Sequence, residues 1–130
     1  MTIIKNIGRY CPTDKQGFIL NDASVAKIQP EHMTLIEDVV EDYRLHMGDH
    51  IHSLYIRGSI PRGLGIYGVS DLDTLAVTHV APGSLDLRWV EEAERIRNHQ
   101  YQGVNGIEFS FYSLKDLLNK TIAFVYTAMI

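Results

Sequence analysis

The chain has 130 residues, of which 22% are charged and 45% hydrophobic, and its formal net charge is −4. It contains no apolar run near the ~20 residues that a membrane-spanning helix needs, no secretory signal pattern in Met1–Arg9, and a single cysteine, Cys11. These features predict one cytoplasmic domain over residues 1–130, without a membrane segment or a disulfide. The basic residues are scattered, which disfavours a long duplex nucleic acid as the substrate because its phosphates are bound by clustered Lys and Arg.

Residues 1–29 form the least regular part of the sequence. Thr2–Ile7 and Phe18–Leu20 have the composition of short strands, and Thr13–Gly17 has the residues of a turn. Beyond these elements, the sequence assigns no fold to this segment.

The central part alternates helix and strand patterns. From Pro30, apolar residues recur at three- and four-residue spacing, which predicts a helix that stops at Gly48. His52–Arg57 then has the pattern of a strand. Residues 58–68 form a glycine-rich connection that begins with a short helical segment, and Asp71–Val77 has the pattern of a second strand.

Two further helices and one strand are predicted downstream. Ser84–Asn98 combines apolar positions with an exposed row of glutamates, as a surface helix does. Gly106–Phe111 alternates apolar and polar residues, as a strand with one buried face does. Ser113, with Asp116 three residues later, resembles a capping box at the start of a last helix. The order of elements predicts an α+β fold with a mixed β-sheet and flanking helices.

Asp71 and Asp73 form the first candidate site. Residues two apart on a strand project from the same face, about 7 Å apart along the chain, so both carboxylates can share one cation. Hard oxygen ligands suit Mg²⁺, which proteins usually hold with one or two carboxylates and the phosphates of a substrate. Because Asp-x-Asp is a short motif, a pair of solvated or turn-forming aspartates at a strand end is the alternative interpretation.

Gly58 and Ser59 form the second candidate site. They follow an apolar strand and precede a segment with helix-starting character, so backbone N–H groups and the Ser59 hydroxyl are suited to bind a phosphate. An ordinary tight turn with Ser59 as its N-cap is the alternative. Arg62 is placed either to contact a phosphate or to lie exposed on the surface, and Ser70 to cap the turn before Asp71.

The two sites belong to a longer pattern, carried by Leu54–Gly63 and Val69–Val77: an apolar strand, Gly-Ser, a spacer, and Asp-x-Asp in the next strand. This pattern resembles the signature of the DNA polymerase beta-like nucleotidyltransferase superfamily. The resemblance covers residues 54–111 and is strongest to the aminoglycoside nucleotidyltransferases and the stand-alone minimal nucleotidyltransferases. It implies a nucleotidyltransferase-like fold and a third carboxylate on a following strand, for which Glu108 is the best match. A half-exposed structural glutamate is the alternative for Glu108.

The resemblance also implies a division of roles within the site. It makes Asp71, Asp73 and Glu108 the catalytic residues and ligands of one or two Mg²⁺ ions, and Gly58, Ser59, Arg62 and Ser70 the residues that bind a nucleoside triphosphate. Glu108 then binds the metal nearer the acceptor or takes the proton from the acceptor hydroxyl. The reaction implied is attack of the acceptor oxygen on the α-phosphorus, with release of pyrophosphate.

Three functions are weighed on this basis. The first is an enzyme that transfers a nucleoside monophosphate, with AMP as the expected group, from a triphosphate to an acceptor hydroxyl. The second is an antitoxin-type or regulatory nucleotidyltransferase module that binds a helical partner protein. The third is a catalytically inactive binding domain, against which the intact Asp71 and Asp73 argue. The acceptor is not encoded in the sequence, although a small molecule or a protein is favoured over a long nucleic acid.

The C-terminal residues form an unusually apolar ending. They predict a final helix that is apolar on most sides and must therefore be buried on several. A homodimer, a helical partner chain or a further C-terminal domain would cover it, and a helix sunk wholly in the core is the alternative. The residues concerned are Leu117, Leu118, Ile122, Ala123, Val125, Tyr126, Ala128, Met129 and Ile130.

Overall fold

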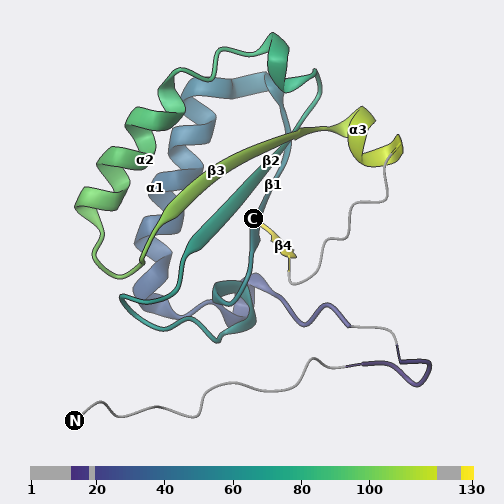
Figure 1. Cartoon of the computed structure of the whole chain (residues 1–130), viewed down its shortest axis with the longest axis vertical. Helices are drawn as coiled ribbons and strands as arrows, with labels where there is room; N and C mark the ends of the chain where they lie inside the picture. The colour runs from purple at the N-terminus through teal and green to yellow at the C-terminus, as the bar shows by residue number, and fades with distance from the viewer. Residues whose placement is uncertain (1–12, 18–19, 120–126) are drawn as a thin grey trace.

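The computed structural model describes residues 13–17, 20–119 and 127–130 (Figure 1). Its main helices are α1 (Pro30–Met47), α2 (Trp89–Gln100) and α3 (Leu114–Asn119). Its strands are β1 (Ile51–Arg57), β2 (Leu72–Thr78), β3 (Ile107–Ser113) and β4 (Thr127–Met129). Short 3₁₀ helices are η1 (Val25–Lys27), η2 (Gly48–His50), η3 (Ile60–Arg62) and η4 (Pro82–Ser84). None of the helices in the described part of the chain is long and apolar enough to cross a bilayer.

The four described strands form one sheet in the order β3-β2-β1-β4. β1 pairs antiparallel with both β2 and β4, whereas β2 and β3 are parallel. A parallel pair needs a crossover connection, and α2 provides it between β2 and β3 (Figure 1). The predicted α+β class, with a mixed sheet and flanking helices, is therefore confirmed.

The core lies between the sheet and the two long helices, which run next to each other on one side of it (Figure 1). α1 contributes an apolar stripe at helical spacing, and Gly48, with a φ of 50°, ends it as predicted. Tyr43 lies at the centre, with its ring centroid 4.9 Å from that of Phe109 on β3 and 5.9 Å from that of Trp89 on α2. The buried stripe of α1 consists of Leu35, Ile36, Val39, Tyr43 and Met47.

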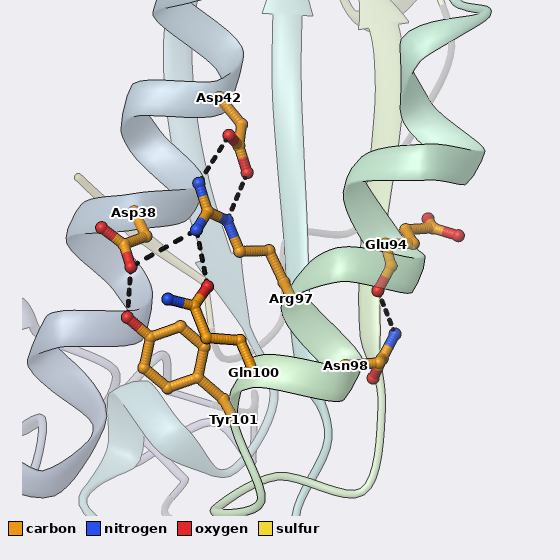
Figure 2. A network of polar contacts seen from close by, with 7 residues as sticks. All are labelled: Asp38, Asp42, Glu94, Arg97, Asn98, Gln100 and Tyr101. Atoms are coloured by element: carbon orange, nitrogen blue, oxygen red, sulfur yellow. Dashed lines mark hydrogen bonds and ion pairs between the residues drawn. The ribbon is translucent and has the colours of Figure 1, made fainter.

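An ion-pair network fastens α2 to α1 (Figure 2). The Arg97 guanidinium donates from Nε and Nη2 to the two carboxylate oxygens of Asp42, each at 2.8 Å, and its Nη1 lies 3.5 Å from Asp38. The Tyr101 phenol also donates to Asp38. Desolvation and the negative charge of Asp38 raise the pKa of Tyr101 to about 12, so this phenol stays protonated at neutral pH.

Replacing Arg97 by methionine should destabilise the domain by about 1–3 kcal/mol. The change keeps most of the aliphatic stem and removes the guanidinium, so Asp42, whose side chain is only 13% exposed, loses its partner. Urea denaturation followed by circular dichroism measures the loss in the free energy of unfolding.

Arg95→Met is the matched control for Arg97→Met, because both arginines lie on α2 and both pair with a carboxylate. The Arg95–Glu92 pair is 67% and 60% exposed, so its loss should leave the free energy of unfolding unchanged. Equal effects of the two substitutions would contradict a stabilising role for the network.

The predicted start of α2 at Ser84 is wrong, because the helix begins at Trp89. The backbone N–H of Arg88 donates to the Asp86 carboxylate at 3.1 Å. Such a local side-chain bond competes with helix formation and holds the preceding residues in a non-helical turn. The strand boundaries differ from the predicted ones by only one or two residues.

The predicted C-terminal helix is correct at its start and wrong at its end. The Ser113 hydroxyl accepts a hydrogen bond from the backbone N–H of Asp116 at 3.0 Å, which is the predicted cap. Thr127–Met129, in contrast, forms β4 beside β1. The β1 edge offers backbone groups that need partners, and the backbone N–H of Ile130 also donates to the carbonyl of Leu54 at 2.8 Å. Pairing along this edge outweighs the apolar helical pattern.

The N-terminal predictions are tested only in part. The predicted turn is closed by a hydrogen bond from the backbone N–H of Gly17 to the carbonyl of Asp14 at 3.1 Å. The predicted strand at Thr2–Ile7 lies outside the described residues, as does most of the one at Phe18–Leu20.

Candidate functional site

Both halves of the predicted motif lie at the same end of the sheet. Gly58 follows the last residue of β1, Arg57, which pairs in register with Asp73 near the start of β2. Gly58 has a φ of 92°, a conformation that favours glycine, and this lets the chain leave β1 and enter η3 directly. The Gly-Ser segment therefore begins directly beside the Asp-x-Asp segment.

A hydrogen bond between side chains joins the two halves. The Ser59 hydroxyl donates to the Ser70 hydroxyl at 3.2 Å, and Ser70 accepts the backbone N–H of Ile66 at 2.8 Å. Ser59 occupies the N-cap position of η3, but its hydroxyl makes no capping bond there. Ser70 closes the turn before Asp71, as predicted.

Asp71, Asp73 and Glu108 line one open hollow of about 300 Å³. Asp73 and Glu108 are direct neighbours in the parallel register of β2 and β3, and Asp71 is the residue before β2. Asp71 and Glu108 are exposed and Asp73 is half-buried. The structure thus brings together three carboxylates that are up to 37 residues apart in the sequence.

The hollow has three further lining residues that the sequence did not indicate: Asn105, Gly106 and Ile107. Two backbone hydrogen bonds hold this segment against the Asp-x-Asp segment. The N–H of Asn105 donates to the carbonyl of Ser70 at 3.0 Å, and the N–H of Leu72 donates to the carbonyl of Gly106 at 2.8 Å. These residues lie at and just before the start of β3, so they could have been found only once the parallel register of β2 and β3 was known.

Arg62 is tied to the scaffold rather than lying exposed. Its Nε donates to the Asp22 carboxylate at 2.8 Å, and both side chains are only 12% exposed. The adjacent Gly63 has a φ of 74°, and a Cβ at this position would lie 2.9 Å from the carbonyl oxygen of Lys27. The alternative of an exposed surface arginine is therefore excluded, while phosphate contact by Arg62 stays a prediction.

The donor set of the hollow fits a hard divalent cation. Three carboxylates on one open surface repel one another, and a cation with oxygen-rich coordination relieves that repulsion. Within residues 13–17, 20–119 and 127–130, no three His, Cys, Asp or Glu side chains are grouped closely enough to enclose an ion by themselves. Mg²⁺ is usually held by one or two carboxylates together with substrate phosphates, and the metal site at this hollow stays a prediction.

Comparison with known proteins yielded no match among family models, curated proteins or solved structures.

Proposed function

We propose that this chain is a metal-dependent nucleotidyltransferase domain with a nucleotidyltransferase-like fold. It transfers a nucleoside monophosphate, with AMP as the expected group, from a triphosphate to an acceptor hydroxyl. The observation that carries this proposal is that Ser59 bonds to Ser70, the residue before Asp71, at the same end of the sheet as the hollow that Asp71, Asp73 and Glu108 line. A phosphate-binding turn next to clustered carboxylates is the arrangement that phosphoryl-type transfer requires.

Each group has a defined task in this reaction. Gly58 and Ser59 bind the triphosphate, and Asp71 and Asp73 hold one or two Mg²⁺ ions together with its phosphate oxygens. Bound Mg²⁺ neutralises the charge that develops on the phosphates. Glu108 accepts the proton of the acceptor hydroxyl or shares the second ion.

The bond changes balance without a further reactant. The acceptor oxygen forms a bond to the α-phosphorus, and the bond from this phosphorus to the oxygen of the β-phosphate breaks. The electron pair of that bond leaves with pyrophosphate, and the acceptor proton passes to Glu108 or to water. Catalysis then comes mainly from alignment and charge neutralisation, because the protein forms no covalent intermediate.

Nucleotide binding to the full chain tests the proposal. Calorimetry with ATP, GTP, CTP and UTP should show binding in the presence of Mg²⁺ and none in the presence of EDTA, with ATP bound most tightly. Binding that is indifferent to Mg²⁺, or the absence of binding for all four nucleotides, would refute the proposed function.

A partner chain remains part of the proposal. Leu118 on α3 and Met129 on β4 are 79% and 64% exposed, which supports a contact with a second copy or with a helical partner. Residues 120–126 of the apolar ending lie outside the described residues. A regulatory module that binds such a partner would share the same nucleotide site, so this second function differs in the acceptor rather than in the chemistry.

A further inference from the structure

A chain of buried hydroxyl groups lies directly behind the carboxylates. The Tyr43 phenol on α1 is 2.7 Å from the Thr74 hydroxyl on β2, and the Thr74 hydroxyl donates to the backbone carbonyl of Glu108 on β3 at 2.7 Å. Tyr43 and Thr74 are 0% and 1% exposed. This series of hydrogen bonds therefore connects α1, through Thr74 on β2, to the backbone of Glu108 on β3.

The direction of each hydrogen bond follows from the number of protons. A threonine hydroxyl has one proton, and Thr74 gives it to the Glu108 carbonyl, so Tyr43 must donate to Thr74. Burial raises the pKa of Tyr43 well above its ordinary value, which keeps the phenol protonated. At neutral pH the Tyr43 phenol therefore keeps the proton that it donates to Thr74.

These hydrogen bonds hold the beginning of β3, an edge strand of the described sheet. β3 has only one neighbour, β2, in the described sheet, and Glu108 is its second residue, where an edge strand frays most easily. Two other side-chain bonds hold the residues that follow Glu108: the Phe109 N–H donates to the Glu94 carboxylate at 3.0 Å, and the Ser110 hydroxyl donates to the Thr74 carbonyl at 2.6 Å. The backbone from Glu108 to Ser110 is therefore held by side-chain groups in addition to the main-chain ladder.

We propose that Thr74, supported by Tyr43, is a positioning residue that fixes Glu108 relative to Asp73 so that both carboxylates can serve one cation. Asp73 precedes Thr74 in the chain and is the register partner of Glu108, so a bond from Thr74 to the Glu108 carbonyl sets the spacing of these two carboxylates. Partners behind a metal ligand typically affect metal affinity by ~10–100-fold. This inference rests on the proposed function, since it concerns the same site.

The test separates cation binding from nucleotide binding. With an ATP analogue that cannot be cleaved at the α-phosphorus, the Mn²⁺ concentration for half-maximal binding is measured for the full chain. Thr74→Val, which keeps the shape and removes the hydroxyl, should raise that concentration about tenfold. Affinity for the analogue at saturating Mn²⁺ should stay unchanged, and Thr74→Ser should restore the wild-type requirement.

Thr78→Val is the matched control, because Thr78 is also fully buried on the same face of β2. Its hydroxyl donates to the carbonyl of Val80 at 2.7 Å and lies 3.4 Å from the carbonyl of Tyr112, at the far end of the strand from the carboxylates. It should lower stability without changing the Mn²⁺ requirement. Equal shifts in Thr74→Val and Thr78→Val would reduce the role of Thr74 to general stability and overturn the proposal.

Tyr43→Phe keeps the test decisive if Thr74→Val does not fold. This substitution removes the phenol that donates to Thr74. It should therefore raise the Mn²⁺ concentration needed for half-maximal binding, as Thr74→Val does. A wild-type requirement in either folded variant would overturn the positioning role while leaving the proposed function intact. A wild-type protein that binds the analogue without Mn²⁺, or not at all, would overturn both.

Discussion

Asp71→Asn and Asp73→Asn together should abolish Mg²⁺-dependent ATP binding and lower nucleotidyl transfer on the order of 10³-fold, the equivalent of several kcal/mol of charge stabilisation. An amide is a much weaker ligand for Mg²⁺ than a carboxylate, and both residues line the same hollow. Isothermal titration with ATP and Mg²⁺ measures the binding, and pyrophosphate release measures the transfer.

The fold should survive this double substitution. Asp71 is exposed and Asp73 half-buried, and removing two like charges relieves repulsion with Glu108. Asp49→Asn is a suitable control, because Asp49 is exposed in η2, before β1, at the opposite end of the sheet from Gly58. Undiminished ATP binding in the folded double variant would eliminate these aspartates as metal ligands.

Glu108→Gln should lower the rate of transfer by ~10²–10⁴-fold while changing ATP affinity little. Glutamine has the same shape but cannot accept a proton, and Glu108 lies on β3, separated by β2 from the end of β1 where the Gly-Ser segment proposed to bind the triphosphate begins. Single-turnover pyrophosphate release gives the rate, and calorimetry gives the affinity.

Glu91→Gln, on the exposed side of α2, provides the comparison for general effects of charge removal. Full activity of Glu108→Gln would show that another group or water accepts the proton. A loss of ATP affinity as large as the loss of rate would instead place Glu108 among the groups that bind the triphosphate.

Local patterns predicted most of the fold because several elements are specified by their own residues. The helix from Pro30 to Met47 carries a regular apolar stripe and a glycine stop, and β3 alternates buried and exposed residues from Ile107. β4 could not be predicted in this way, because its pairing depends on an edge of β1 that becomes available only when the sheet forms. Tertiary pairing there outweighed local propensity.

The site shows the same division between local and long-range information. Spacing alone predicted Asp71 and Asp73 on one face of a strand, whereas Glu108 was predicted from the family resemblance, matched by its order in the chain and the alternation of its strand. Neither could indicate Asn105, because its position depends on the parallel register of two strands joined by a helix. The support of Glu108 by Thr74 was invisible for the same reason.

The Glu94 side chain protects the β3 edge of the sheet from pairing with a strand of another molecule. By accepting the outward backbone N–H of Phe109, its carboxylate occupies a position that a strand from another molecule would need in order to extend the sheet beyond β3. A strand added at this edge would have to displace the Glu94 carboxylate and would bring its own backbone carbonyl groups close to that negative charge. Addition of a further strand to the sheet is therefore disfavoured at the β3 edge, whereas Met129 on β4, at the other edge of the described sheet, lies exposed.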